Sequence, residues 1–226
     1  MAKRSKRYRS EAKKVKSDVP VSVADAVEMV KKFDSAKYNQ SIEIAMRLGI
    51  DPKQADQLVR GSIVLPHGIG KTLRICVIAK GDKAEEAKSA GADTVGDADL
   101  VTKIKEGWTD FDVCIATPDM MGLVGPLGKV LGPRGLMPSP RAGTVTMDVA
   151  KTINEYKAGK VEFRNDKAGV VHAIVGKIKF EKQQLVENVE AFIQYVQQLK
   201  PTAVKGTYVK SVTISATISP GVKVLC

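Results

Sequence analysis

The sequence has few of the features that mark a membrane protein, a disulfide-stabilised protein or an enzyme. It contains no run of about 18 apolar residues, so no transmembrane helix is expected. The basic N-terminus lacks the apolar segment of a signal peptide. There are only three cysteines, and Cys76 and Cys114 lie inside apolar, strand-like runs. We therefore expect buried thiols, no disulfide framework and a reducing cytoplasm.

Motifs for catalysis, metal binding and nucleotide binding are also scarce. The two histidines, His67 and His172, are far apart and have no nearby cluster of metal-ligating residues. GxSxG and GxGxxG are absent. HGIGKT (67–72) resembles the end of a P-loop, but Leu65 stands where the first glycine belongs, and a strand-like run follows where a helix is needed. We expect a connector here, and no catalytic site, metal or cofactor.

The positive charge is confined to the two ends of the chain. The net charge is +11. Residues 68–159 contain twelve basic and twelve acidic residues, whereas residues 1–67 contain 14 and 8, and residues 160–226 contain 10 and 5. An excess of this size indicates a polyanionic partner. It also suggests that both ends form one discontinuous basic domain, although three loosely associated segments remain an alternative.

The terminal blocks contain patterns typical of strands and two amphipathic helices. Apolar residues alternate over 41–48, and Leu185, Val189, Phe192 and Val196 share one helical face. A linker at 165–169 has the turn residues of a hairpin. The expected helices are 22–33 and 181–200, and the expected strands are 41–48, 59–65, 160–164, 170–175 and, last in the chain, 207–219.

The middle block alternates between strands and helices. We expect strands at 72–79, 94–95 and 113–116, and helices at 83–90, 100–106 and 147–156. This order favours an α/β layer with mostly parallel pairing. The predicted fold class is therefore α/β with an α+β first domain. Residues 1–67 plus 160–226 form a split β-α-β sheet domain, and 68–159 form an inserted three-layer α/β domain.

Three basic or polar segments are open to two interpretations each. KRSKRYRSEAKKVK (3–16) is either a solvated terminus or an arm that orders on phosphates. The alternating row from Thr207 to Ser219 carries hydroxyls at every position but Val209, which suits either a solvent-facing sheet or contacts to phosphate and ribose. Lys37-Tyr38 suits either stacking on a base or cover of a sheet edge.

The glycine- and proline-rich segment 122–143 carries Lys129, Arg134 and Arg141. It is either a rigid surface connection, which the residues alone favour, or a loop that presents amides and cations to phosphates. The second interpretation supports an alternative function, a phosphate-ligand-binding α/β enzyme that uses Lys129 and Arg134. No paired acid and base accompany these residues.

Three long runs carry a resemblance to a known family. LGIDPKQADQLVRGSIVLPHGIGK (48–71), ATPDMMGLVGPLGKVLGPRGLMPSPRAGTV (116–145) and GKVEFRNDKAGVVHAIVGK (159–177) resemble the large-subunit ribosomal protein L-one family of bacterial type. The resemblance covers essentially the whole chain. It implies a non-enzymatic, two-domain protein that binds large-subunit rRNA at the mobile stalk, assists release of deacylated tRNA from the exit site, and represses its own operon mRNA. It further implies a cytoplasmic, ribosome-associated protein without a membrane partner, monomeric off the ribosome.

The resemblance also implies site residues. Tyr38 stands where the family more usually has Phe, and Thr217-Ile218-Ser219-Pro220 stands for Thr-Met-Gly-Pro. Serine in place of glycine puts in doubt any close backbone approach or positive φ there. Gly68, Gly70 and Gly159 are expected at an interdomain hinge. Together with the residue patterns, this gives expected RNA contacts at Lys37, Tyr38, Ser41, Glu43, Arg60, Arg164, Lys167, His172, Ser211, Thr213, Thr217, Ile218 and Ser219, with Arg4, Arg7, Lys129 and Arg134 as further candidates.

Overall fold

The chain forms two compact units, and each is described by itself. The computed structural model describes residues 4–15, 19–33 and 37–225. Unit 1 comprises Met1–Gly70 and Val161–Cys226, and unit 2 is Lys71–Lys160. The sequence analysis placed the two boundaries after residues 67 and 159. By these units, the basic and acidic residues number 23 and 13 in unit 1, but 13 and 12 in unit 2.

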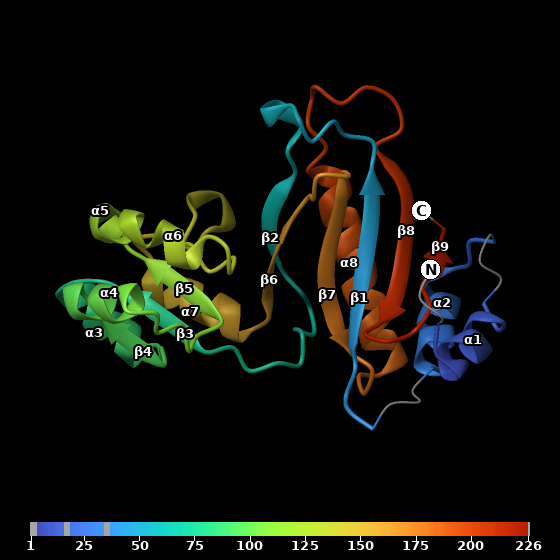
Figure 1. Ribbon diagram of the computed structural model, residues 1–226, viewed down its shortest axis with the longest axis horizontal. Helices are drawn as coiled ribbons and strands as arrows, with labels where there is room; N and C mark the ends of the chain where they lie inside the picture. The colour runs from blue at the N-terminus through green and yellow to red at the C-terminus, as the bar shows by residue number, and fades with distance from the viewer. Residues whose placement is uncertain (1–3, 16–18, 34–36, 226) are drawn as a thin grey trace. The chain divides into compact units, whose positions relative to one another are not determined.

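Unit 1 is built on a four-stranded antiparallel sheet (Figure 1). Its strand order is β7-β1-β8-β9, with β7 at Val170–Lys177, β1 at Ser41–Leu48, β8 at Val209–Ala216 and β9 at Val222–Val224. The expected strand 207–219 is therefore shorter, and the chain continues into one further strand. A separate two-stranded sheet pairs β2 (Arg60–Val64) with β6 (Lys160–Arg164).

Two helices cover one face of the four-stranded sheet. These are α2 (Val23–Lys31) and α8 (Lys182–Gln198), which runs behind β7 and β1 in Figure 1. Ser22 caps α2 by accepting a hydrogen bond from the Asp25 amide. The alternation of β1 buries Ile42, Ile44 and Met46 completely, and Phe192 of α8 is equally buried. This face is the hydrophobic core of the unit, so the opposite face of the sheet is left open.

The linker at 165–169 makes a turn but does not join two paired strands. Asn165 and Val171 form a single antiparallel bridge, and the Asp166 amide donates to the Val170 carbonyl. Beyond this bridge, β6 pairs with β2 and β7 pairs with β1. The turn is as expected, but the prediction that strands 160–164 and 170–175 pair with each other as a hairpin is wrong. Asn165 instead exchanges hydrogen bonds with Val59, which precedes β2.

Unit 2 is a three-layer α/β domain, as the sequence predicts. Its parallel sheet has the order β4-β3-β5, with β4 at Thr94–Gly96, β3 at Ile75–Ile78 and β5 at Val113–Ala116. Helices α3 (Asp82–Ser89) and α7 (Val149–Lys157) pack on one face, through Ala87, Val149 and Ile153. Helix α4 (Ala98–Lys105) packs on the other face with short helices from the glycine-rich segment.

The glycine-rich segment 122–143 is folded into the core and is not an open loop. It contains most of α5 (Met121–Val124) and all of α6 (Gly128–Leu131), together with 3-10 turns at Gly125–Leu127 and Pro140–Ala142. Val124, Leu127 and Leu131 have no exposed surface, and they pack with Cys76 and Ile104. Their spacing of three and four residues gives these short helical turns one apolar side.

Candidate nucleic-acid interface

The open face of the unit 1 sheet brings together polar side chains from three strands. Antiparallel pairing sets Glu43 beside Ser215, Ala45 beside both Thr213 and His172, and Arg47 beside Ser211. Side chains alternate between the two faces of a strand, so all of these residues lie opposite the buried core. Glu43, Arg47 and His172 are exposed, and the three hydroxyl residues are partly exposed. The face therefore carries donors and acceptors for ribose and base edges.

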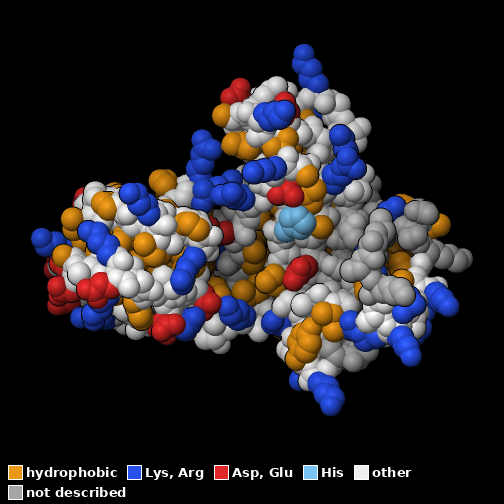
Figure 2. Space-filling view, in the orientation of Figure 1, with side chains coloured by type: hydrophobic (Ala, Val, Ile, Leu, Met, Phe, Trp, Pro, Cys, Tyr) orange, Lys and Arg blue, Asp and Glu red, His pale blue; other side chains and the backbone are white. Residues whose placement is uncertain are grey.

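Basic side chains surround this open face. Figure 2 shows Lys and Arg side chains around the sheet, and it shows basic and acidic side chains mixed over unit 2. The figure agrees with the sequence counts, in which the basic excess belongs to unit 1. A polar face within a basic rim suits a nucleic-acid backbone, because phosphates need cations while sugars and bases need neutral hydrogen-bonding groups.

One end of the sheet gathers several of the expected contacts. Ser41 begins β1 and pairs with Lys177 at the end of β7, whose Nζ donates to the Ser41 hydroxyl at 2.7 Å. The Thr217 hydroxyl, just past β8, accepts from the Ser41 amide at 3.1 Å. Lys37 and Tyr38 precede β1, and the Tyr38 ring is 51% exposed. An exposed tyrosine beside a lysine is available to stack on a base.

The turn at Thr217-Ile218-Ser219 is held by side-chain hydrogen bonds. The Ser219 hydroxyl accepts from the Ala216 amide at 2.9 Å, and the Ser219 amide donates to the Ala216 carbonyl at 3.1 Å. Among the described residues, only glycines have positive φ. Ser219 therefore does not need the positive φ that a glycine at this position could have adopted.

The turn before β7 presents another group of the expected residues. Lys167 lies in this turn and is exposed, as are Arg164 at the end of β6 and His172 in β7. Asp166 organises this turn, because its carboxylate accepts from the amides of Val170 and Ala168, each at 2.8 Å. These amide bonds, the Val170 bond first, hold the pKa of Asp166 below its usual value. The turn therefore keeps its shape and its negative charge near neutral pH.

Arg60 begins β2 and is partly exposed, and Arg164 ends β6, the strand that pairs with β2. The side chain of the buried Asn165 sets this pairing by accepting from the Val59 amide at 2.9 Å. The two arginines belong to the two-stranded sheet and not to the open face. The expected contacts in unit 1 therefore fall on two neighbouring sheets.

Arg4 and Arg7 belong to the N-terminal segment, which contains a helix that was not expected from the sequence. Helix α1 spans Lys6–Ala12, and Ser5 caps it by accepting from the Tyr8 amide. The Arg7 guanidinium donates to the Ile218 carbonyl at 3.0 Å. This part of the expected basic arm therefore packs against the turn after β8. Lys3 and Lys16, which also belonged to that arm, lie outside the described residues.

The remaining candidates, Lys129 and Arg134, are exposed in unit 2 and so belong to the other unit. Lys129 lies on α6, and the Arg134 guanidinium donates to the Thr109 hydroxyl. Among the residues that the structure describes, no three His, Cys, Asp or Glu side chains are grouped so as to hold a metal ion. Cys76 and Cys114 are free and buried, as the sequence predicts.

The three expected hinge glycines lie close to the changeover between the units. Gly68, Gly70 and Gly159 all have positive φ, at 63°, 66° and 104°. A Cβ on Gly70 would lie 2.7 Å from the Phe180 ring, so no larger residue fits there without a shift. The chain before Gly70 is fixed to α8, because the buried Asn188 side chain accepts from the His67 amide and donates to the Gly68 carbonyl.

Sequence reasoning missed several members of the open face. Arg47 and Ser215 were placed on the correct side of their strands but were not included among the contacts. Ile174, which is 39% exposed, and Lys177 were not identified. Their alternation within 170–177 was a usable signal, but their neighbours depend on a register that single-strand patterns do not contain. No helix in the described part of the chain is long and apolar enough to cross a membrane.

The family comparison agrees with this geometry. Residues 30–220 match the family described as "Ribosomal protein L1p/L10e family", which is most of the chain and includes β7, β1 and β8 of the open face. The match supports a ribosomal protein of the large subunit that binds RNA, rather than an enzyme. The chain belongs to the ribosomal protein L1p/L10e family.

Proposed function

We propose that unit 1 binds a folded segment of large-subunit rRNA on the open face of its four-stranded sheet. The observation that carries the proposal is the row formed by Ser211, Thr213 and Ser215. Register places this row beside Arg47, Ala45 and Glu43 of β1, and His172 lies on the other side of Ala45. Hydroxyl groups both donate and accept, so they suit ribose 2′-OH groups and phosphates. The Glu43 carboxylate suits an amino group on a base edge.

The proposed binding forms the mobile stalk beside the tRNA exit site, where the protein assists release of deacylated tRNA. Unit 2 carries nearly balanced charge, so in this proposal it contributes less to RNA affinity than unit 1. Gly68, Gly70 and Gly159 form the hinge on which unit 2 moves in this proposal. Because Asn188 holds the Gly68 carbonyl to α8, the movement takes place in the chain that follows this carbonyl and at Gly159.

We also propose that the same face binds the protein's own operon mRNA and represses its translation. One surface can serve both RNAs if they share a fold, because the donors and acceptors on the sheet read shape and ribose groups. The protein acts as a cytoplasmic monomer when it is off the ribosome. The proposed contacts need no cofactor, since each of them comes from a side chain of unit 1.

The experiment that tests the open face removes one hydroxyl and no charge. Thr213→Val should weaken binding to a folded rRNA stalk fragment by roughly tenfold, the effect of one lost hydrogen bond to a charged group. The slope of log affinity against log salt should not change, because the variant loses no cation. Thr102→Val, on α4 of unit 2, is the matched control and should bind like the wild type. Equal affinities for Thr213→Val and the wild type would remove this face from the interface.

A further inference from the structure

We propose that a pocket between α1 and the turn after β8 binds one phosphate group of the RNA backbone, with Arg4 and Arg7 as its cations. The proposal rests on the proposed function and deepens it. It concerns a segment that the family match does not include, because α1 (Lys6–Ala12) precedes residue 30, where the match begins. The open sheet face does not account for these arginines.

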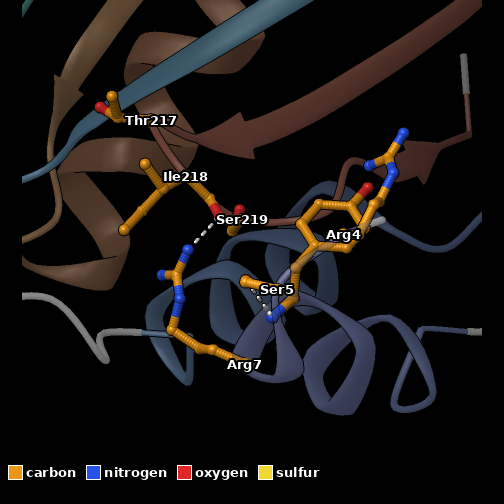
Figure 3. Close-up of a pocket in the computed structure, with 7 residues that line it drawn as sticks. Arg4, Ser5, Arg7, Thr217, Ile218 and Ser219 are labelled. Carbon is orange, nitrogen blue, oxygen red and sulfur yellow. Dashed lines mark hydrogen bonds between the residues drawn. The ribbon is translucent and has the colours of Figure 1, made fainter. Parts of the chain in front are cut away.

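The pocket is small and open to solvent, and the described residues that line it include no acidic side chain. Its volume is about 420 Å³, enough for a phosphate group and its neighbouring sugar to enter from one side. Figure 3 shows the α1 side chains and the turn on opposite sides of it. The lining residues are Arg4, Ser5, Arg7, Tyr8, Thr217, Ile218 and Ser219. Two arginines with no carboxylate among these seven residues favour an anion over a cation or an apolar ligand.

Arg7 is held in place before any ligand arrives. Its guanidinium donates to the Ile218 carbonyl at 3.0 Å, although 211 positions separate the two residues in the sequence. The side chain is partly buried, so its position depends on packing as well as on this bond. A cation that is fixed in advance loses little conformational entropy when a phosphate binds.

Arg4 is exposed but is also oriented. Its guanidinium carbon lies 4.2 Å from the centroid of the Tyr8 ring, which is a cation–π contact. Tyr8 is half-buried, and its amide donates to the Ser5 hydroxyl that caps α1. Arg4 therefore lies against a supported aromatic ring. Guanidinium groups bind phosphate oxygens with two parallel N–H bonds, which suits arginine to this role better than lysine.

The position of the pocket ties it to the open face. Its wall at Thr217 is joined to Ser41, the first residue of β1, through the Thr217 amide and hydroxyl. Ser41 lies at the end of the sheet where Lys177 and Tyr38 are also found. A strand of RNA that lies on the open face and leaves it at this end would place its backbone at the pocket. The ligand is therefore a phosphate within a longer RNA and not a free anion.

The test compares two variants of the full chain that lose the same charge. Arg4→Ala/Arg7→Ala removes the two pocket cations, and Lys13→Ala/Lys14→Ala removes two exposed cations from the chain just after α1. Affinity for a folded rRNA stalk fragment is measured at several salt concentrations. For the arginine variant we expect the salt slope to fall by about one and the affinity at moderate salt by roughly tenfold. The lysine variant should change the slope by less than half as much.

Two further measurements separate the alternatives. Arg4→Ala alone keeps the bond between Arg7 and Ile218, so it should lose part of the affinity while its thermal unfolding matches the wild type. Inorganic phosphate could instead bind saturably to the RNA-free protein and fail to bind the arginine variant. The ligand of the pocket would then be a free anion and not the RNA backbone, which would overturn the proposal. Equal behaviour of the arginine and lysine variants, with tight wild-type binding, would overturn the pocket and leave the proposed function intact. Failure of the wild type to bind the fragment would overturn both.

Discussion

Ser219 replaces a glycine expected from the family pattern and takes part in the turn that it forms. Its hydroxyl accepts from the Ala216 amide, and it also contacts the carbonyls of Ala216 and Pro220 at 3.4 and 3.1 Å. A hydroxyl has one proton, so it donates to one of these carbonyls at a time. The serine therefore fixes the turn next to Thr217, where glycine would leave the backbone freer.

This role predicts the effect of restoring the glycine. Ser219→Gly loses the bond to the Ala216 amide and adds backbone freedom to the unfolded chain, so it should lower the free energy of unfolding of unit 1 by about 1–2 kcal/mol. RNA affinity should change by less than about threefold, because the backbone conformation at 219 is already accessible to serine. Denaturant unfolding and RNA titration measure the two quantities. A variant that binds rRNA far more tightly would instead show that serine has degraded the site.

The start of unit 2 is fixed by one carboxylate that joins two strands. Asp112, just before β5, accepts from Lys71 Nζ at 2.8 Å and from the Arg74 amide, just before β3, at 3.1 Å. The Lys71 hydrogen bond is the main reason that the pKa of Asp112 falls to about 2. The Asp112 side chain is 22% exposed and that of Lys71 is 52% exposed, so solvent weakens the pair.

The lowered pKa predicts how the stability of unit 2 depends on pH. The contribution of Asp112 is complete above its ordinary pKa of 3.8, and it is lost as pH falls through the folded value of about 2. With solvent screening taken into account, we expect a loss of about 1 kcal/mol in the free energy of unfolding between pH 5 and pH 2. Thermal unfolding of the wild type and of Asp112→Asn over this range measures it. The variant should lack this part of the pH dependence, and an identical profile for both proteins would refute the assignment.

Individual elements could be predicted where a local pattern was long enough. The alternation of 41–48 predicts β1 with the bounds that the structure shows, and the apolar face of 181–200 predicts α8 to within two residues at each end. Strand β9 was missed because three residues are too short for a pattern to register. The segment 122–143 was misjudged because its glycines and prolines hid the apolar spacing of Val124, Leu127 and Leu131.

The candidate site could be predicted only in part, for a related reason. The hydroxyl row is visible in the alternation of β8, but the residues beside it depend on pairing between strands that are far apart in sequence. His172 meets Ala45, and Ser211 meets Arg47, only through this register. Contacts such as that from Arg7 to Ile218 have no local signal at all, because they join the two ends of the chain.

At the scale of the whole molecule, the two units differ in net charge because the basic residues are concentrated at the two ends of the chain. Unit 1 gathers both basic ends of the chain, whereas unit 2 is nearly neutral. A basic unit alone would attract any polyanion, and such attraction weakens steeply as salt rises. The hydroxyls of the open face carry no charge, so their contribution depends on shape and hydrogen bonding. We therefore expect RNA binding to be specific and not only electrostatic.

The most direct measurement is the affinity of the full chain for a folded rRNA stalk fragment and for a generic RNA duplex, at low and at moderate salt. We expect both RNAs to bind at low salt. At moderate salt, we expect the affinity for the stalk fragment to exceed that for the duplex by about 100-fold or more. A parallel loss of affinity for both RNAs as salt rises would contradict specific binding. The charge of unit 1 would then attract any RNA, and the open face would not distinguish the stalk fragment from the duplex.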